Sequence, residues 1–449
     1  MPVELAERYA TPVPRYTSYP TAPHFHADID DASYRRWIAA LPGDATLSLY
    51  IHVPFCDRLC WFCGCHTKQI HRYAPVTKYL SALHAEITSV AGLLAGRGKV
   101  VAIHLGGGSP SMLTPGDFLA LNALLRSHFV VSEEVEFSIE IDPNDMDETR
   151  YDALAAIGIT RVSLGVQDFN PEVQAAINRI QTYEQTKAVV DAMRRRGVHS
   201  VNLDILYGLP HQTVRSVEAT ARQALTLQPD RLAIFGYAHV PWLKTHQRMI
   251  EESALPGIRE RFEQAQAAAR EVVAAGYEAI GFDHFARPAD DLAAAAREGR
   301  LHRNFQGYTV DSATALIAFG ASAIGRLPQG YVQNTVATAT YQRQIEANGT
   351  AIDRGVALTD EDHLRSYAIE RLLCDFSIAR SDLRQRFGDL AEPLALEMAA
   401  VAAGDTDGLT EFDGDRLVVT PRGRPFIRAI AASFDAYLLK DGARYSIAV

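Results

Sequence analysis

Short apolar runs rich in β-branched residues alternate with helix-like segments along the middle of the chain. The runs are LSLYIHV (47–53), VVAIHLG (100–106), VEFSIEID (135–142), RVSLGVQ (161–167), VNLDILYG (201–208), RLAIFGY (231–237) and YEAIGF (277–282). Between the first two runs, apolar residues recur at helical spacing from Leu80 to Leu94. This alternation predicts an α/β fold with a parallel sheet, either an open doubly wound sheet or a barrel. Six or seven such units favour a partial (β/α)6-type barrel, with functional residues at the carboxyl ends of its strands.

The segments on either side of this alternation have different patterns. The N-terminal TPVPRYTSYPTAPHFH is rich in proline and aromatic residues and has no period, which predicts an ordered arm because aromatic side chains are scarce in free tails. From Leu358 the pattern is helical, and GLTEFDGDRLVVTPRG predicts a hairpin about Asp413 and Gly414. The sequence thus predicts an N-terminal arm (1–40), a catalytic domain (41–350) and a mostly helical, winged-helix-like C-terminal domain (358–449).

The charge and the N-terminus exclude several function classes. A net charge of −10 argues against a general nucleic-acid or membrane-surface binder, and the C-terminal domain has no basic run that would suit DNA. The chain starts with MPVELAERYATPVPRYTSYP, which lacks the basic start and apolar run of a signal peptide. No apolar stretch approaches the roughly 20 residues that a membrane helix needs. We therefore expect a cytoplasmic protein whose cysteines stay reduced and serve a metal or catalysis. No pattern in the sequence sets the oligomeric state, and we assume a monomer.

Four of the five cysteines lie within ten positions directly after the first apolar run. Cys56, Cys60 and Cys63 form the spacing C-x3-C-x2-C, and Cys65 follows closely. Structural zinc, the alternative, prefers two well-separated cysteine pairs, and Cys374 stands alone. A 4Fe–4S cluster is normally held by four thiolates, so three on one loop leave one iron open to a ligand. Cys63 and Cys65 are too close together to reach two irons without strain, so we expect Cys65 not to be a ligand and Cys374 to be a small buried residue.

Polar and small residues follow the other runs, at the expected carboxyl ends of the strands. The glycine-rich HLGGGSPSML lets the backbone approach a ligand closely at Gly107, Gly108 and Ser109. Carboxylates suit ribose hydroxyls and ammonium groups, and arginine suits carboxylates. The other positions that we expect to converge at this end of the sheet are Glu140, Gln167, Arg179, Asp204 and Ala238.

The cysteine spacing, with Trp61 two residues before the last cysteine of the motif, resembles the signature of the radical S-adenosylmethionine (radical SAM) enzymes. The strings PRYTSYPT, SLYIHVPFC, CWFCGC, GVQDFN, YGLP, FDHFARPADDLA and HRNFQGYT are similar to those of one branch, the oxygen-independent coproporphyrinogen III oxidases. The similarity runs from Pro14 into the C-terminal domain. PRYTSYPT and HRNFQGYT distinguish this branch from its near relatives, which keep the cysteine motif.

The resemblance implies the anaerobic oxidative decarboxylation of two propionate side chains of coproporphyrinogen III to vinyl groups, giving protoporphyrinogen IX in haem biosynthesis. The β-carbon of a propionate is unactivated, so no side-chain base can remove its proton. A 5′-deoxyadenosyl radical, generated from SAM at a 4Fe–4S cluster, would take the hydrogen atom instead, before CO2 and one electron are lost. The protein would supply orientation and a pocket that excludes water. An electron donor and an electron acceptor, neither identified, would complete the reaction.

The resemblance also implies residue roles. Cys56, Cys60 and Cys63 would hold the cluster, with Tyr50 beside the sulfonium of SAM. Phe305 and Gln306 would line a second SAM site, and for Phe305 core packing is the alternative. Beyond what the resemblance implies, we infer that Arg15 and Tyr16 in the arm cover the pocket and pair with propionates. The residues implied in binding the cofactors are Tyr50, Phe62, Gly64, Cys65, Gly107, Gly108, Ser109, Glu140, Gln167, Arg179, Asp204 and Ala238, with Ile324 on the adenine side unless it too is core packing.

Two other functions are alternatives. Another porphyrin-acting radical SAM enzyme on the same scaffold would use the same cluster but release no CO2. A haem chaperone would bind and transfer haem without catalysis, but such relatives lack the aromatic arm and HRNFQGYT, both of which are present here. Stoichiometric haem binding without formation of deoxyadenosine would distinguish the chaperone from either enzyme.

Overall fold

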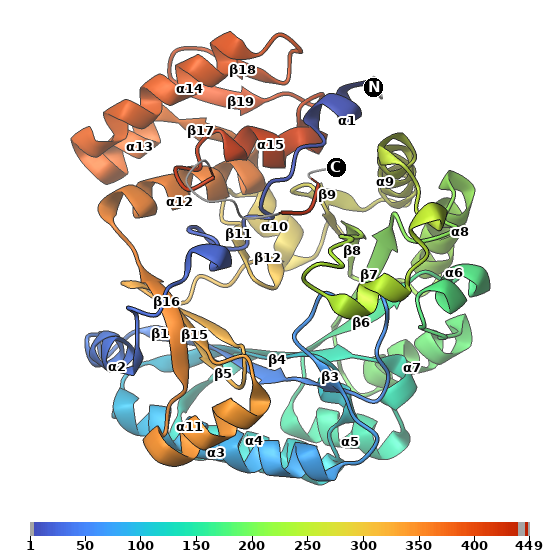
Figure 1. The fold of residues 1–449 in the computed structure, drawn as a ribbon, viewed down its shortest axis with the longest axis vertical. Coiled ribbons are helices and arrows are strands. Elements are labelled where there is room, and N and C mark those ends of the chain that lie inside the picture. The colour runs from blue at the N-terminus through green and yellow to red at the C-terminus, as the bar shows by residue number, and fades with distance from the viewer. Residues whose placement is uncertain (1–3, 439–444, 448–449) are drawn as a thin grey trace. The chain divides into compact units, whose positions relative to one another are not determined.

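The computed structural model describes residues 4–438 and 445–447, which fall into two compact units. Unit 1 comprises Met1–His24, Ile205–Val310 and Leu358–Val449, and unit 2 comprises Phe25–Asp204 and Asp311–Ala357. Each unit is built from segments that are far apart in the sequence, as the colours of Figure 1 show. None of the described helices is long and apolar enough to cross a membrane.

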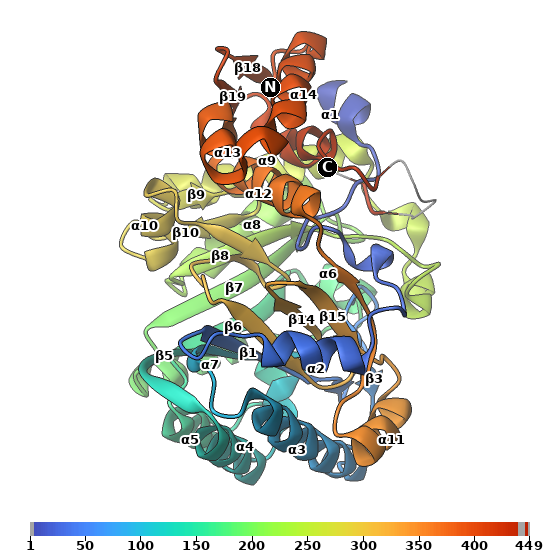
Figure 2. The same cartoon turned by 90° about the vertical axis from the view of Figure 1, so that its left-hand side faces the viewer.

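Unit 2 contains the first four predicted parallel strands. β1 (Thr46–Val53), β4 (Lys99–Gly107), β5 (Val130–Ile141) and β6 (Arg161–Gln167) pair in this order, each parallel to the next. β7 (Ser200–Tyr207) follows in the chain, and the boundary between the units falls within it. The connecting helices are α3 (Ala74–Leu94), α4 (Pro115–His128), α5 (Glu148–Ile157), α6 (Pro171–Ala176) and α7 (Tyr183–Arg195). In two perpendicular views, α3, α4 and α5 lie along one face of the β1–β4–β5 strands (Figures 1 and 2).

The helix α3 packs with its predicted face inward. The five apolar residues at helical spacing, from Leu80 to Leu94, are all at most 4% exposed. On the neighbouring strand β1, Leu47, Leu49 and Ile51 are at most 1% exposed. Apolar side chains at period 3.6 on the helix and period 2 on the strand thus meet in one core.

Unit 2 continues beyond β1 with strands that the sequence pattern did not predict. β13 (Ala315–Phe319) pairs parallel to β1, and β14 (Ile324–Leu327), β15 (Gly330–Asn334) and β16 (Ile352–Ala357) follow as an antiparallel series. α11 (Thr338–Asn348) connects β15 to β16, and α2 (Asp31–Ala39) precedes β1. The later residues of the predicted arm therefore belong to unit 2 and include a helix. The division into arm, catalytic domain and C-terminal domain stays a prediction.

Glu86 is a carboxylate buried in the core of unit 2, only 2% exposed. It accepts hydrogen bonds from the backbone N–H of Gly320 (2.8 Å), the side-chain amide of Asn334 (2.7 Å) and the hydroxyl of Tyr341 (2.6 Å). It therefore ties α3 to the loop after β13, to β15 and to α11. Burial raises the pKa of the Glu86 carboxyl from its ordinary 4.5 to about 7, against the three hydrogen bonds, which lower it.

We expect Glu86 to make the free energy of unfolding depend on pH. A carboxyl whose pKa is higher in the folded state stabilises the fold fully below pH 4.5, and this contribution is lost as the pH rises through about 7. The loss amounts to about 3 kcal/mol for a shift of this size. Urea unfolding of the protein and of Glu86→Gln from roughly pH 5 to pH 8 measures it. As the pH rises, the free energy of unfolding of the parent protein should fall relative to that of Glu86→Gln. A difference between the two that does not change with pH would contradict the prediction.

Unit 1 contains the later strands, and here the parallel pattern ends. β8 (Arg231–Gly236) pairs antiparallel with β10 (His284–Ala286), which pairs antiparallel with the edge strand β9 (Glu278–Ile280). The seventh apolar run is therefore an antiparallel strand, not a seventh parallel unit. The other elements of this segment are α8 (Val214–Leu225), α9 (Ile258–Ala274), α10 (Asp291–Arg297) and the hairpin of β11 (His302–Asn304) and β12 (Gly307–Thr309).

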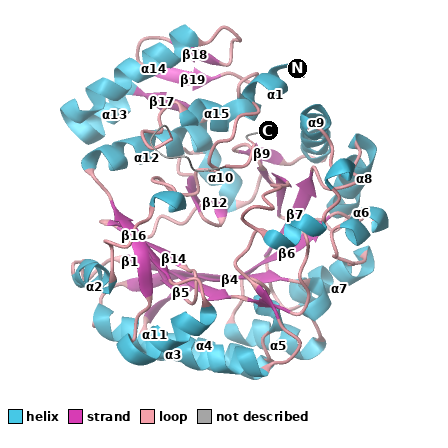
Figure 3. Cartoon of the chain, viewed as in Figure 1, coloured by secondary structure: helices cyan, strands magenta, loops and turns pink. Residues whose placement is uncertain are grey.

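The C-terminal segment of unit 1 is mostly helical, as predicted (Figure 3). Its helices are α12 (Asp360–Asp375), α13 (Arg380–Phe387), α14 (Glu392–Gly404) and α15 (Ile427–Ala432). β17 (Ser377–Ala379), β19 (Arg416–Val419) and β18 (Thr410–Phe412) form a small antiparallel sheet. The hairpin of β18 and β19 about Gly414 is confirmed, as is the burial of Cys374, which is 5% exposed.

Residues 4–24 form an ordered arm within unit 1, beginning with α1 (Glu4–Tyr9). Tyr16 and Tyr19 are 4% and 2% exposed, so the expectation that the aromatic side chains of the arm are packed is confirmed. The Tyr16 hydroxyl donates to the Asp435 carboxylate (3.0 Å), and the Ala436 N–H donates to the Tyr19 hydroxyl (3.0 Å). The start of the chain is therefore held by residues close to its end.

Candidate active site

The cysteine-rich loop follows β1 and is held at several points. β2 (Phe55–Cys56) pairs with β3 (Lys68–Gln69) and folds the loop back on itself. The Trp61 N–H donates to the Ile177 carbonyl (2.9 Å), and the Asn178 side chain donates to the Leu59 carbonyl (2.9 Å). Residues just before Arg179 thus anchor the middle of the loop, between the first and third cysteines of the motif.

Arg179 connects the loop to the neighbouring strands. Its guanidinium donates to the Cys60 sulfur (3.6 Å), the Asp142 carboxylate (3.1 Å) and the Gly165 carbonyl (2.9 Å). Burial lowers the pKa of Arg179, but the charges of Asp142 and Cys60 more than reverse this. Burial raises the pKa of the Cys60 thiol, and the Arg179 charge opposes the rise. The predicted site residues Arg179 and Cys60 are therefore in contact.

We expect Arg179→Gln to lower the free energy of unfolding by about 3 kcal/mol, because Asp142 is left as a poorly compensated buried charge. The side chains of Arg179 and Asp142 are only 10% and 18% exposed. Urea unfolding measures the change, and adding Asp142→Asn should recover part of it. The matched control is Arg222→Gln, whose ion pair with Glu271 joins a 56% and a 26% exposed side chain and should contribute less than about 1 kcal/mol. Equal losses in both variants would contradict the prediction.

Glu140 lies at the centre of a second group of contacts. One carboxylate oxygen accepts the Gly107 N–H (3.0 Å), and the other lies 3.5 Å from His104 Nε2. Burial raises the pKa of Glu140, but the hydrogen bond and charge of His104 and the Gly107 N–H outweigh it, and the pKa lies below its usual range. The side chain keeps 44% of its surface exposed, so its desolvation is incomplete. Glu140 is thus an ionised and accessible carboxylate.

Two histidines on the strands complete this group, and the sequence pattern did not single them out. The Tyr50 hydroxyl lies 2.9 Å from His52 Nδ1, and His52 Nε2 lies 2.9 Å from the carbonyl of His66 in the cysteine loop. The Tyr50 ring stacks on His104, with centroids 5.8 Å apart. The signal in the sequence is a histidine within each of two otherwise apolar runs, YIHV and AIHLG.

The backbone of Gly106, Gly107 and Gly108 passes close to these groups. A Cβ on Gly106 would lie 3.0 Å from both Tyr50 and His104. Gly107 has a φ of +119°, which disfavours other residues, and a Cβ there would lie 2.7 Å from the His52 ring. Glycine is therefore required where β4 ends between Glu140 and the cysteine loop.

Ser109 behaves differently from its glycine neighbours. It is 5% exposed, and its hydroxyl donates to the Asp145 carboxylate and lies 3.0 Å from the Ser111 hydroxyl. Burial raises the pKa of Asp145 to about 6. The Ser109 hydroxyl therefore forms its hydrogen bonds with other side chains of the protein.

Gln167 and Asp204 lie on the strands after Glu140. The register sets Glu140 opposite Ser163 on β6, and the Ser163 hydroxyl donates to Asp204 on β7 (3.1 Å). A Cβ on Gly165 would lie 2.7 Å from the Gln167 amide and 3.3 Å from the Arg179 guanidinium, so both side chains approach that glycine. Glu140, Gln167, Arg179 and Asp204 thus come together across β5, β6 and β7.

Of the remaining predicted residues, Cys65 lies near this group, since a hydrogen bond with Cys63 and the charges of Cys63 and Glu140 raise the pKa of its thiol. Phe62 and Ile324 in unit 2 are half-buried, and Gly64 and Cys65 are exposed. Three others belong to unit 1. Ala238 follows β8, where its carbonyl accepts from Gln247 (3.2 Å), and Phe305 and Gln306 form the turn between β11 and β12. Phe305 is half-buried and Gln306 exposed, so Phe305 is not a core residue.

The donor set of the loop fits a 4Fe–4S cluster. Among the described residues, no three His, Cys, Asp or Glu side chains could hold a single metal ion. A cluster instead takes one thiolate per iron, and Cys56, Cys60 and Cys63 carry free thiols on one anchored loop. Cys56 Sγ lies 3.1 Å from the Thr67 hydroxyl, Arg179 donates to Cys60 Sγ, and the Cys65 N–H donates to Cys63 Sγ (3.4 Å), so each of the three sulfurs has a hydrogen-bonding partner.

Known proteins match the chain over nearly its whole length. Residues 50–224 match the radical SAM superfamily, and residues 358–426 match the HemN C-terminal domain. An oxygen-independent coproporphyrinogen III oxidase of Bradyrhizobium diazoefficiens is 48% identical over 98% of both chains, and one of Escherichia coli is 41% identical over 97% of this chain and 95% of its own.

The solved structure of coproporphyrinogen III oxidase (HemN) from Escherichia coli, described as a radical SAM enzyme, matches with a TM-score of 0.91 at 40% identity. The match covers 94% of this chain and 98% of that one, and it confirms the predicted α/β radical SAM fold with its C-terminal helical part. The chain therefore belongs to the radical SAM superfamily and, within it, to the family of oxygen-independent coproporphyrinogen III oxidases.

Proposed function

We propose that this chain converts two propionate side chains of coproporphyrinogen III to vinyl groups without O2, giving protoporphyrinogen IX in haem biosynthesis. Each conversion releases CO2 and removes a hydride equivalent, and the enzyme is an oxidoreductase. The observation that carries the proposal is the anchored C-x3-C-x2-C loop beside Glu140, in a chain that is 48% identical over 98% of its length to a relative named for this reaction.

A 4Fe–4S cluster and SAM, when bound, would supply a carbon radical that can take a hydrogen atom from an unactivated carbon. Cys56, Cys60 and Cys63 would hold the cluster. Arg179 would keep the Cys60 sulfur in place through its hydrogen bond, and its positive charge favours the thiolate. Cys65 is exposed and would remain outside the ligand set.

Glu140 and the glycine segment would hold the amino group of SAM. An ionised carboxylate suits an ammonium group, and the Gly107 N–H fixes the orientation of Glu140 by occupying one of its oxygens. The absence of Cβ atoms at Gly107 and Gly108 lets this segment pass close to the His52 ring and to the Phe55 backbone, which holds it against the cysteine loop. Tyr50, Gln167 and Asp204 would complete this first SAM site, with Phe62, Gly64 and Cys65 from the loop and Ile324 from β14. The role of Ala238, which lies in unit 1, stays an expectation from the resemblance.

A second SAM is proposed at the turn between β11 and β12. Gln306 is exposed and Phe305 only half-buried, so both side chains keep surface that a ligand can cover. Two conversions per substrate suit two SAM molecules per turnover. We further propose a cytoplasmic location, because the five cysteines are free thiols. We also propose a monomer that works with a separate electron donor and acceptor.

The test is anaerobic reconstitution with iron and sulfide, followed by SAM, a strong reductant and coproporphyrinogen III. Protoporphyrinogen is measured by fluorescence after oxidation, and 5′-deoxyadenosine in parallel. We expect both products. Deoxyadenosine without vinyl product would support the radical chemistry and show that coproporphyrinogen III is not the substrate. Tight haem binding with neither product would identify a haem carrier.

A further inference from the structure

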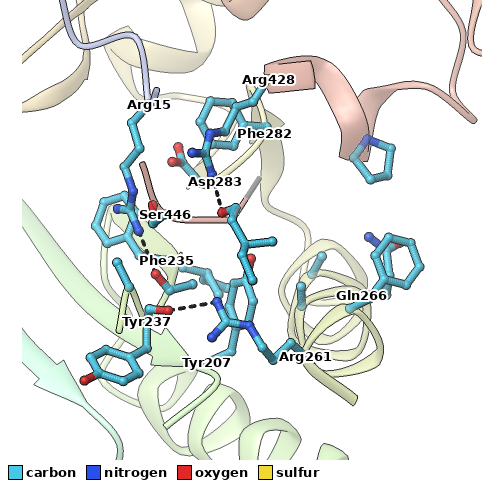
Figure 4. Close-up of a pocket in the computed structure, with 18 of the residues that line it drawn as sticks. Arg15, Tyr207, Phe235, Tyr237, Arg261, Gln266, Phe282, Asp283, Arg428 and Ser446 are labelled. Atoms are coloured by element: carbon cyan, nitrogen blue, oxygen red, sulfur yellow. Dashed lines mark hydrogen bonds between the residues drawn. The ribbon is translucent and has the colours of Figure 1, made fainter. Parts of the chain in front are cut away.

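A pocket in unit 1 is lined by arginines from three separate segments (Figure 4). Arg15 enters it from the N-terminal arm, Arg261 from α9 and Arg428 from α15. Aromatic rings, including Tyr207 and Phe235, also line its wall, together with small and aliphatic residues. In a chain whose net charge is −10, this is a local concentration of positive charge.

Arg15 and Arg261 are bound only by neutral groups. The Arg15 guanidinium donates to the Gly236 carbonyl (2.6 Å), and that of Arg261 donates to the Tyr237 carbonyl (2.8 Å). Neither forms a salt bridge with any residue that the structure describes, and the buried Nε of Arg261 has no hydrogen-bond partner among them. Both guanidinium groups therefore keep N–H donors available to an anion.

The carboxylate that lines the pocket, Asp283, is already engaged elsewhere. It lies 2.6 Å from His284 Nδ1 and 3.7 Å from the guanidinium of Arg303. Burial lowers the pKa of both Arg15 and Arg261, and nearby positive charge adds to this, whereas the charge of Asp283 opposes it only in part at Arg15. Burying cations without enough anions is unfavourable, so the pocket suits a negatively charged group in addition to those that the described residues provide.

We propose that Arg15 and Arg261 bind the carboxylate of a propionate side chain that the porphyrinogen keeps in the product. This inference rests on the proposed function for the identity of the substrate. Guanidinium groups hold carboxylates through paired, charge-assisted hydrogen bonds, which fix orientation as well as strength.

The argument for a retained rather than a reacting propionate is energetic. Loss of CO2 removes the negative charge, so arginines that stabilise a carboxylate oppose its decarboxylation. The same arginines on a distant, unreactive propionate hold the substrate in place without this penalty, and binding energy from remote groups then positions the reacting carbon. The pocket would thereby determine which side chains react.

Equilibrium binding of porphyrins to the protein without its cluster tests the proposal without relying on activity. The probes are coproporphyrin III, with four propionates, and protoporphyrin IX, which has only the two that are retained. We expect Arg261→Gln and Arg15→Gln each to lower the affinity for both porphyrins by a similar factor, roughly 10- to 100-fold. The matched control, Arg270→Gln, removes an exposed charge from the same helix and should leave both affinities unchanged. Arg261→Lys keeps the charge without the forked geometry and should give an intermediate loss.

Weaker binding of coproporphyrin alone would assign the pocket to a reacting propionate and overturn the proposal. Unchanged binding of both probes in variants with normal thermal unfolding would also overturn it, as would an equal loss in Arg270→Gln. The proposed function is tested separately. If the parent protein forms vinyl product but the arginine variants bind both porphyrins unchanged, the proposed function holds and the role of the pocket is wrong. If the variants bind both porphyrins more weakly but the parent forms no vinyl product, the pocket binds propionate and the proposed function is wrong.

Discussion

Cys60→Ser is expected to abolish iron binding and vinyl formation, whereas Cys65→Ser is expected to keep the iron. The structure separates these two cysteines clearly. Cys60 receives a hydrogen bond from the buried Arg179, while Cys65 is exposed and its backbone N–H donates to the sulfur of Cys63 (3.4 Å). That contact suits a residue that supports a ligand sulfur through its backbone, and the Cys65 thiol is not needed for it.

Iron and sulfide content after anaerobic reconstitution measures the difference. We expect roughly four irons per chain in the parent and in Cys65→Ser, and close to none in Cys60→Ser. Cys374→Ser is the control for loss of a thiol far from the loop, since Cys374 lies buried in α12. Loss of iron in Cys65→Ser to the same extent as in Cys60→Ser would show that a fourth thiolate closes the cluster.

Gly108→Ala is expected to have the second largest effect, because it forces β4 and the cysteine loop apart. A Cβ on Gly108 would lie 2.6 Å from the carbonyl oxygen and 2.9 Å from the backbone nitrogen of Phe55, the residue before Cys56. These are backbone atoms and cannot rotate away. The same two segments are joined by the hydrogen bond from the Ser109 N–H to the Phe55 carbonyl (2.8 Å), which the displacement would break.

We expect Gly108→Ala to lower the free energy of unfolding by up to about 3 kcal/mol and to reduce cluster retention. Urea unfolding and iron content measure the two effects. Gly116→Ala is the control, since its nearest neighbour would lie 3.9 Å away and alanine favours the helix α4 by up to about 1 kcal/mol. A Gly108→Ala protein as stable and as rich in iron as the control would show that the segments separate without cost.

The parallel strands could be predicted from the sequence because each is a continuous apolar run set between helices. The strands β13 to β16 could not be predicted in this way, because they are short and contain glycines such as Gly325 and Gly330. β9 has the same local pattern as a parallel strand, and only its partner β10 makes it antiparallel. Strand direction is set by pairing between segments, which a local pattern does not contain.

The candidate site divides in the same way. The cysteine loop, the glycines and the strand-end carboxylates are visible as short motifs, and Glu140 and Arg179 take part in the contacts that their positions suggested. Of the two arginines proposed to bind a propionate, only one could be predicted from the sequence. Arg15 stood out in an aromatic arm, but Arg261 belongs to an amphipathic helix, where an arginine is expected to face solvent.

The attachment of the arm to the end of the chain has a consequence for biosynthesis. Tyr16 donates to Asp435, 419 residues further on, so the arm can be attached only after the C-terminal segment has been synthesised. At ordinary translation rates this delay is on the order of a minute, during which two buried tyrosines are exposed. A nascent chain that stops before α15 therefore exposes the tyrosines of the arm and lacks Arg428, one of the three arginines that line the pocket.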